Sequence, residues 1–478
     1  MSTNKLPAQA EDFPAWYVEV VKRAELAEHG PAKGSMIIKP HGYAMWELTQ
    51  RALDDRFKAT GHENVYFPLL IPMSLLAKEA DHVEGFEPQV AVVTRGGGEE
   101  LDEPLAIRPS SESIIWNTYR KWIQSYRDLP LLYNQWCNVM RWEMRTRLFL
   151  RTSEFLWQEG HTAHATADDA LAETLRMLDV YRQVSEDVLG IPVHMGRKSA
   201  GERFPGAVET YCVEGLMRDA KALQCGTSHF LGQNFGKAYD VTFLNADGVS
   251  EHAWGTSWGF STRMIGGTIM AHGDDAGLRL PPAVAPIQVA IVPIFRTDEE
   301  RTSVLGVAEN VRADLAALGI RVRLDDRDQH RPGYKFAEWE LKGVPIRIEL
   351  GPRDVAENRV VLASRLGGDK EEVAVADVAG GMPARLASVQ ETLFADALAY
   401  REANTHEIRS FDSFAAGVAE QGGFWVGAWC GDGACEAEIS TKTKASIRFL
   451  PLEPTDPGTA CMHCGNPGVD VATWARAY

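Results

Sequence analysis

The chain has 478 residues, 45% of them hydrophobic, so it can bury a large core and is long enough for about two to four domains. Its formal net charge of −17 argues against coating nucleic acid non-specifically, so any polyanion site must be local. No long uncharged apolar run occurs and residues 1–17 lack the pattern of a signal peptide, so we expect a cytoplasmic protein without a membrane partner.

Residues 1–282 mix amphipathic helix patterns with β-rich runs such as NVYFPLL and KAYDVTFL, and they predict one large α+β domain. Within it, LLYNQWCNVMRWEM and EFLWQEGHTAHA are rich in aromatic and branched residues. They predict a long antiparallel hairpin joined by the loop RTRLFLRTS.

This loop and its flanks carry Arg141, Arg145, Arg147 and Arg151. A solvated ion-pair ladder, with Glu143 or Glu154 as partners, is the simplest interpretation. The alternative is a bound polyanion, because arginine binds phosphate through two parallel hydrogen bonds and stacks on rings. The arginines alone do not decide between the two.

The Pro-rich residues 279–286 mark a boundary, and residues 283–404 alternate predicted strands and helices as a compact α/β module. The first helix has one apolar face and ends at Gly319, where a left-handed cap is expected. The apolar face consists of Val304, Val307, Ala308, Val311, Leu315 and Leu318.

Residues 405–478 form a third unit, which contains Cys430, Cys435, Cys461 and Cys464. The spacing, C-x4-C and then C-x2-C, is typical of a tetrahedral Zn²⁺ site with thiolate ligands, and four cysteines leave no open position. We therefore predict one structural Zn²⁺. His463 is a less favoured substitute ligand.

Three ordered segments resemble the motifs of class II aminoacyl-tRNA synthetases. Arg-x-Glu at 141–143 and Arg-x-x-x-Phe at 151–155 resemble motif 2. Residues 42–70, with a helix and a strand ending at Pro68, resemble motif 1, and residues 255–275, with Arg263, resemble motif 3. RPSSES, EFLWQEGHTAHAT, LQCGTSHFLGQNF and residues 325–345 resemble the prolyl-tRNA synthetase family of the archaeal and eukaryotic-like type, over nearly the whole chain.

The resemblance implies a multidomain α+β and α/β fold: a class II antiparallel-sheet catalytic domain at 1–282, an α/β anticodon-binding domain at 283–404 and a C-terminal zinc-binding α+β domain at 405–478. It implies ligation of proline to tRNA(Pro), with ATP and Mg²⁺, by a homodimer formed through motif 1. Two of the three serines in RPSSES, Ser110 and Ser113, replace threonines of the usual family pattern, and each replacement keeps the hydroxyl and loses a methyl group.

The implied roles fall into three groups. Arg141, Glu143 and Arg263 are the expected catalytic residues, and the expected ATP site adds Arg151, Phe155, Gln224, Thr227 and Ser261. The expected proline site consists of Ser110, Glu112, Arg141, Trp157, Phe204 and His229. The expected tRNA contacts are Arg145, Arg147, Phe336, Glu340, Arg347 and Arg353.

Two other functions are compatible with the sequence: a silent paralogue that binds tRNA or ATP, and a synthetase for threonine, serine or glycine. The retained motif arginines argue against the first, and the RPSSES and WQEGHTAH segments against the second. Roughly sixty residues separate HTAHAT from LQCGTSH, too few for a hydrolytic insertion domain, so we expect no proofreading in cis. The chain end, Tyr478, approaches the active site in this family.

Overall fold

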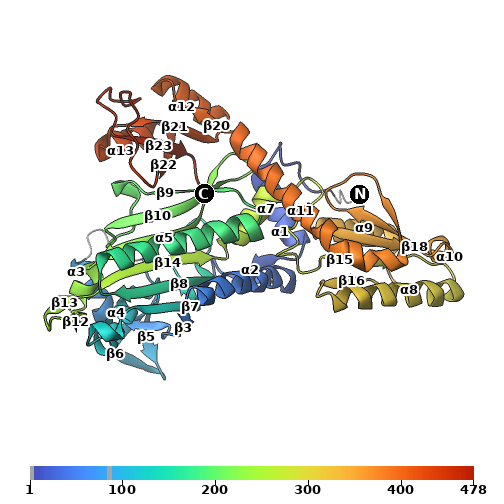
Figure 1. The fold of residues 1–478 in the computed structure, drawn as a ribbon, viewed down its shortest axis with the longest axis horizontal. Helices are drawn as coiled ribbons and strands as arrows, with labels where there is room; N and C mark the ends of the chain where they lie inside the picture. Colours follow the sequence, from blue (N-terminus) through green and yellow to red (C-terminus); the bar gives the residue numbers. More distant parts are fainter. Residues whose placement is uncertain (1–4, 83–88) are drawn as a thin grey trace.

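The structure is a computed structural model that describes residues 5–82 and 89–478. Its elements gather into a large body, an α/β module at one side and a smaller C-terminal unit above the body (Figure 1). Among the described residues, no helix is both long and apolar enough to span a bilayer.

A seven-stranded sheet forms the centre of the large body. In spatial order it consists of β3 (Glu63–Asn64), β7 (Leu131–Met140), β8 (Glu154–His164), β14 (Trp254–Ser261), β11 (Ala222–Gly232), β10 (Glu209–Leu216) and β9 (Val193–Arg197). Neighbours from β7 to β9 are antiparallel, which matches the antiparallel class II sheet that the resemblance implied. The edge strand β3 pairs in parallel with β7 and has only two residues. The strand expected to end at Pro68 therefore forms only at Glu63–Asn64.

One face of this sheet is covered by α5 (Ala167–Gln183), which lies along the strands (Figure 1). Ser228 on β11 donates a hydrogen bond to the Thr174 carbonyl of α5 at 2.7 Å. Because strand side chains alternate, Thr227 and His229 point to the opposite face. The main core includes residues of α1 (Phe13–Arg23), α2 (Pro40–Ala59) and α7 (Arg263–His272).

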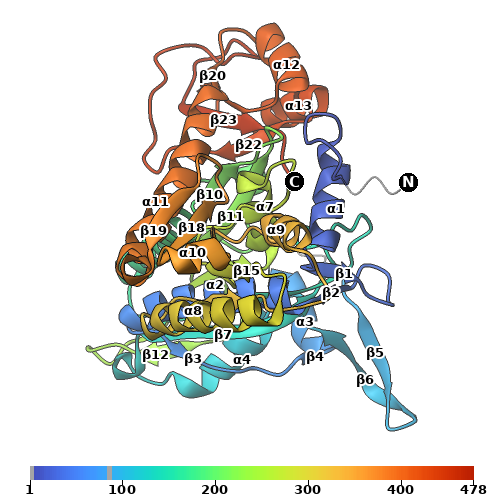
Figure 2. The same ribbon diagram turned by 90° about the vertical axis from the view of Figure 1, so that its right-hand side faces the viewer.

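The remaining elements of the body are short. The sheet β4-β6-β5 comprises Leu70–Pro72, Glu99–Ile107 and Val92–Gly96, and its β5–β6 hairpin projects outward (Figure 2). Around it lie α3 (Met73–His82), α4 (Glu112–Trp122) and α6 (Asn234–Ala238). Two further pairs are β1 (Ala27–His29) with β2 (Met36–Ile38), and β12 (Thr242–Leu244) with β13 (Ser250–His252). The run KAYDVTFL is thus a strand only at its end.

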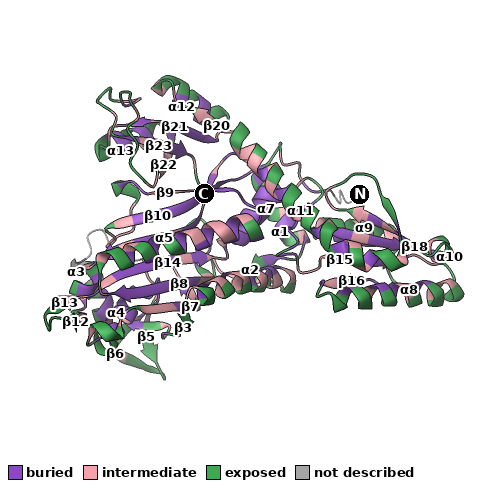
Figure 3. Ribbon diagram, viewed as in Figure 1, coloured by how far each residue is buried: buried purple, intermediate pink, exposed green. Residues whose placement is uncertain are grey.

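The α/β module has the strand order β16 (Val322–Leu324), β15 (Val289–Pro293), β17 (Ile346–Leu350), β18 (Arg359–Ser364) and β19 (Glu371–Ala374). The helices are α8 (Asp298–Ala317), α9 (Pro332–Leu341), α10 (Pro352–Ala356) and α11 (Val375–Ala403). The predicted apolar face of α8 is buried at Val304, Ala308, Val311 and Leu315, and its outer side is exposed (Figure 3). Gly319 has the expected left-handed φ of 76°, and Leu318, the last position of the predicted apolar face, lies just beyond the helix end and is 54% exposed.

The long helix α11 leads to the C-terminal unit (Figures 1 and 2). This unit contains the sheet β20 (Thr405–Glu407), β21 (Phe424–Trp429), β23 (Asp470–Ala475) and β22 (Ser446–Phe449), with α12 (Phe411–Glu420) and α13 (Gly433–Thr443). It is attached to the edge of the large sheet, where Arg197 of β9 forms an antiparallel bridge with Leu450. The unit therefore covers an edge strand whose backbone groups would otherwise be unpaired.

Candidate functional site

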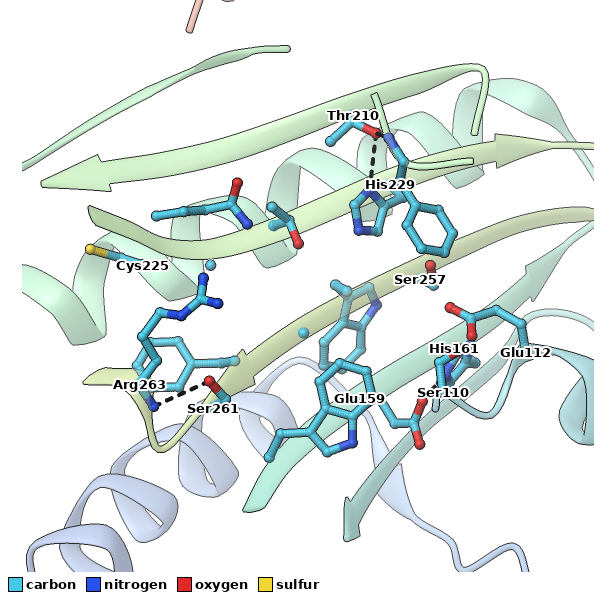
Figure 4. Close-up of a pocket in the computed structure, with 18 of the residues that line it drawn as sticks. Ser110, Glu112, Glu159, His161, Thr210, Cys225, His229, Ser257, Ser261 and Arg263 are labelled. Atoms are coloured by element: carbon cyan, nitrogen blue, oxygen red, sulfur yellow. Dashed lines mark hydrogen bonds and ion pairs between the residues drawn. The ribbon is translucent and has the colours of Figure 1, made fainter. Parts of the chain in front are cut away.

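A pocket of about 350 Å³ lies on the face of the large sheet that α5 leaves open (Figure 4). Its walls come from β8, β11 and β14, from the segment before α4 and from the segment between β9 and β10. Eleven of the residues selected from the sequence line it: Ser110, Glu112, Arg141, Phe155, Trp157, Phe204, Gln224, Thr227, His229, Ser261 and Arg263. Segments that are far apart in sequence therefore converge on one cavity.

Arg141 provides positive charge within the pocket. Its guanidinium carbon lies 5.6 Å from the ring centre of Phe155 and 5.2 Å from that of Trp157, and Nε donates to the Pro109 carbonyl at 3.0 Å. Arg141 is exposed to solvent through the open pocket. Desolvation by the surrounding protein atoms lowers its pKa, and the negative charges of Glu112 and Glu159 partly offset this shift. An arginine keeps its charge under such a shift, so the pocket retains a fixed cation.

Arg263, at the start of α7, supplies a second cation. Its backbone N–H donates to Ser261 Oγ at 3.2 Å. Desolvation, and then the charges of Arg141 and Arg151, lower the pKa of Arg263. Cations that repel one another in a partly dry site are stabilised when an anion binds between them, which favours a phosphate-bearing ligand here.

The other end of the pocket is acidic and contains two residues to which the sequence analysis gave no role, Glu159 and His161 (Figure 4). Glu159 accepts hydrogen bonds from His161 Nε2 at 3.0 Å and from the backbone N–H and hydroxyl of Ser111. Burial alone raises the pKa of Glu159, but these hydrogen bonds lower it overall. Burial alone lowers the pKa of His161, but Glu159 and Glu112 raise it overall. Both shifts favour the charged forms, a carboxylate on Glu159 and an imidazolium on His161.

Glu112 lies beside this pair, with one carboxylate oxygen buried and without a hydrogen-bond partner among the described residues. A buried carboxylate oxygen without a partner is costly unless a ligand supplies the donor, so it indicates a cationic or N–H-bearing substrate group. The signal for Glu159 and His161 was present in the sequence. They follow Trp157 at intervals of two on β8, and strand alternation places all three on one face.

Aromatic rings close the same end of the pocket. The Phe204 ring stacks on His229 with centroids 4.5 Å apart, and Thr210 Oγ1 lies 3.0 Å from His229 Nδ1. Desolvation, and then the charges of His161 and Arg141, lower the pKa of His229 to about 3. His229 is therefore neutral near neutral pH and presents an apolar face to a ligand.

Gln224 and Thr227 both line the pocket although they are three residues apart on β11. Simple alternation would place them on opposite faces. The pairing with β10 shifts at Val213/Glu214 and leaves Cys225 as an extra residue. Such a bulge reverses the alternation and turns both polar side chains toward the cavity.

Glu143 and Arg151 do not line the pocket. Arg151 Nε lies 3.2 Å from Glu143 Oε2, and the Arg151 side chain is 54% exposed. Glu143 thus pairs with an arginine, as the ion-pair interpretation of the sequence suggested. Although Arg151 lies outside the pocket lining, its charge lowers the pKa of Arg263. Arg145 is exposed in the same loop.

The chain end packs against this loop rather than in the pocket. The Arg147 guanidinium carbon lies 5.7 Å from the Tyr478 ring centre, and Tyr478 Oη donates to Asp219 at 2.5 Å. Arg147 is therefore half-buried and differs from the freely exposed Arg145. The two loop arginines that the sequence grouped together have different surroundings.

In the α/β module, the structure brings together two of the four selected residues. The Arg347 guanidinium carbon lies 4.4 Å from the Phe336 ring centre, and Arg347 also pairs with Glu349 at 2.9 Å. Glu340 follows Phe336 by four residues on α9 and Arg353 lies on α10; both side chains are exposed.

The four C-terminal cysteines meet as a candidate metal centre. All their sulfur atoms lie within 4.8 Å of one another, and Cys435 Sγ is 3.8 Å from Cys461 Sγ. Sulfur ligands at 2.3 Å from a tetrahedral zinc ion lie about 3.8 Å apart, so the donor set fits that ion. Burial alone raises the pKa of Cys461, but nearby backbone N–H groups outweigh it and lower the pKa to about 7, which favours the thiolate.

Comparison with known proteins gives three family matches in chain order. Residues 93–272 match the class II tRNA synthetase core domain for G, H, P, S and T, residues 288–385 match an anticodon binding domain, and residues 411–478 match the C-terminal domain of prolyl-tRNA synthetases. Together these matches account for most of the chain.

Full-length relatives are also similar. The proline--tRNA ligase of Chlorobium phaeobacteroides is 52% identical over 99% of this chain and all of the relative, and that of Amoebophilus asiaticus is 50% identical over the same shares. A crystal structure of prolyl-tRNA synthetase from Cryptosporidium parvum, complexed with halofuginone and AMPPNP, is 36% identical and superposes with a TM-score of 0.94, covering 100% of this chain and 98% of that one.

Proposed function

Because the chain belongs to the prolyl-tRNA synthetase family, we propose that the pocket on the open face of its large sheet is where proline and ATP react. As a proline--tRNA ligase, the chain activates proline to prolyl-adenylate and transfers prolyl to the 3′ end of tRNA(Pro), releasing AMP and diphosphate. The observation that carries the proposed site is a single cavity with acidic groups at one end and arginines at the other.

Proline occupies the acidic end in this proposal. Glu112 accepts a hydrogen bond from the secondary ammonium of the ring, and Arg141 binds the carboxylate. The neutral rings of Trp157, Phe204 and His229 enclose the ring methylenes, with Ser110 at the wall. The stacked Phe204–His229 pair and the unpartnered oxygen of Glu112 support this placement.

ATP occupies the basic end. A carboxylate that attacks a phosphate brings negative charge to negative charge, so fixed cations must offset it. Arg141 serves the α-phosphate and the attacking carboxylate, and Arg263 and Arg151 serve the outer phosphates, while Phe155 stacks on adenine. Gln224, Thr227 and Ser261 provide polar nucleotide contacts.

Mg²⁺ is held mainly by the phosphate oxygens, with Glu143 or Gln224 as the protein ligand. The substrate carboxylate is already ionised near neutral pH, so the first step needs no general base.

Arg145 and Arg147 contact the acceptor end of tRNA(Pro), while Phe336, Glu340, Arg347 and Arg353 contact its anticodon region. The Phe336–Arg347 stack offers a flat cationic surface for an unpaired base. We further propose domains at 1–282, 283–404 and 405–478, a homodimer formed through the motif 1 segment 42–70, and a cytoplasmic location.

We propose that one Zn²⁺ is held by Cys430, Cys435, Cys461 and Cys464. With four thiolate ligands the ion would have no open coordination position, so it would cross-link the fold and take no part in catalysis. Elemental analysis of the purified chain should find about one zinc per chain. Cys435→Ser should lose it and lower the melting temperature. Exposed Cys464→Ala should weaken retention less than buried Cys435→Ser, and equal metal content in all three proteins would contradict the site.

Amino-acid-dependent pyrophosphate exchange tests the function as a whole. We expect exchange with proline that exceeds exchange with threonine, serine or glycine by at least about a hundredfold, because the stacked Phe204 and His229 rings close the amino-acid end of the pocket around an apolar ring. A signal with threonine alone would identify a different synthetase, and no signal with any amino acid would identify a silent paralogue.

Alanine should enter this pocket and remain on the tRNA. An apolar pocket separates neighbouring side chains by only about 1–3 kcal/mol, so some alanine is activated. The residues between HTAHAT and LQCGTSH, where an editing domain would be inserted, form α5, β9 and β10 of the large body. Alanyl-tRNA(Pro) incubated with the enzyme should therefore persist about as long as without it, and rapid enzyme-dependent deacylation would contradict the prediction.

A further inference from the structure

The segment 198–208, between β9 and β10, carries Phe204 to the proline end of the pocket. Its only regular structure is the three-residue turn Ala200–Glu202. Phe204 N–H donates to Thr210 Oγ1 at 3.0 Å, which fixes one end of the segment next to β10. The other end begins at Lys198 and Ser199, so their contacts decide where Phe204 lies.

Both of these residues are held by the C-terminal unit. Ser199 Oγ donates to Glu436 Oε1 at 2.7 Å, and the two residues are only 1% and 6% exposed. Lys198 Nζ donates to the Arg448 carbonyl and to Glu214 Oε1, each at 2.8 Å. The base of the pocket segment is thus fixed from outside the large body.

Two elements of the C-terminal unit make these contacts. Arg448 lies on β22 and its guanidinium pairs with buried Glu214 of β10 at 2.8 Å. Glu436 lies in the first turn of α13, directly after Cys435 of the four-cysteine cluster. In Figure 1, β22 lies beside β9 and β10. A short, buried path therefore leads from the cysteine cluster to the pocket segment.

We propose that Glu436 is a positioning residue for the amino-acid pocket: through Ser199 it fixes the segment that places Phe204 against His229. The inference rests on the proposed role of Phe204 in binding proline. The segment carries Phe204 to the proline end of the pocket and holds none of the residues proposed to bind ATP, so we expect its loss to affect proline binding more than ATP binding.

The Ser199–Glu436 pair is a better test than Lys198–Glu214–Arg448. Removing one member of a buried charge cluster leaves an uncompensated charge and endangers the whole fold. Ser199→Ala removes a single neutral donor, and Glu436→Ala removes its acceptor from the other side. Glu436→Gln keeps an acceptor oxygen at the same place and serves as the conservative variant.

Pyrophosphate exchange at varied proline and ATP concentrations is the first measurement. We expect Ser199→Ala and Glu436→Ala each to raise KM for proline about tenfold and to leave kcat and KM for ATP within about twofold. The double variant should be no worse than either single variant, because both remove one interaction. Glu436→Gln should recover most of the affinity for proline, and exposed Glu420→Ala on α12 serves as the matched control.

Hydrogen exchange provides a readout independent of activity. Amides of the segment 198–208 should exchange faster in Ser199→Ala and Glu436→Ala, while those of α5 remain unchanged. Unchanged KM for proline in these variants, with a raised value in Phe204→Ala, would overturn the inference and leave the proposed site intact. No effect of Phe204→Ala would overturn both, and multiplicative effects in the double variant would overturn the link between Ser199 and Glu436.

Discussion

Arg141→Ala should lower the rate of prolyl-adenylate formation by about a thousandfold, with little change in the melting temperature. In the proposed site, Arg141 lies between the carboxylate of proline and the α-phosphate of ATP, and its ring contacts and its hydrogen bond to Pro109 hold its side chain in the pocket. Its contribution is greatest in the transition state, when two anionic groups approach each other. The measurement is single-turnover formation of AMP-linked proline.

Arg145→Ala is the matched control in the same loop. Arg145 is exposed and outside the pocket lining, so this variant should form adenylate at the normal rate. It should instead weaken transfer to tRNA, and this loss should be greatest at low salt and shrink as salt rises, because the variant has one phosphate contact fewer and therefore a smaller salt dependence. Arg151→Ala should resemble Arg141→Ala. Equal losses of adenylate formation in all these variants would mean that the loop acts as one undifferentiated basic patch.

Glu112→Gln should raise KM for proline about a hundredfold, or about 2.7 kcal/mol, and leave KM for ATP unchanged. The change keeps the shape of the side chain but removes the charge that the unpartnered Glu112 oxygen offers to the ring ammonium. Calorimetric titration with proline alone measures the effect without catalysis.

Glu99→Gln, an exposed change on the outer β5–β6 hairpin, should bind proline normally and controls for the substitution itself. If Glu112→Gln also bound proline with normal affinity, the ammonium would have to lie elsewhere in the pocket. If it lost affinity for ATP equally, Glu112 would act on the pocket as a whole.

The hairpin β7–β8 was predictable because its two runs are long and flank a polar loop. The antiparallel sheet and eleven lining residues followed from the motif resemblance, which fixes residues at set positions along strands. The bulge at Cys225 was not predictable, because one extra residue in a strand leaves no periodic signal. Leu318 shows the related limit that a helical pattern does not reveal its last buried turn.

The charged clusters were the least predictable feature. Lys198 and Glu214 are 16 residues apart, and Arg448 lies a further 234 residues along the chain, yet the three form one buried group. From the sequence, each of these residues is expected at the surface, because charged side chains are rarely buried without a partner of opposite charge. Their pairing is a property of the fold and not of any local stretch of sequence.

The attachment of the chain end to the sheet has a consequence for synthesis on the ribosome. Ala222 of β11, two residues before Gln224, donates its N–H to the Arg476 carbonyl at 2.8 Å. Translation produces β11 more than 200 residues before this partner emerges, as the bridge between Ala222 and Ala477 shows. The strand β11 can therefore form early in synthesis, but Ala222 gains this backbone partner only once residues 476–478 have emerged, so a nascent chain without them leaves this end of β11 unpaired.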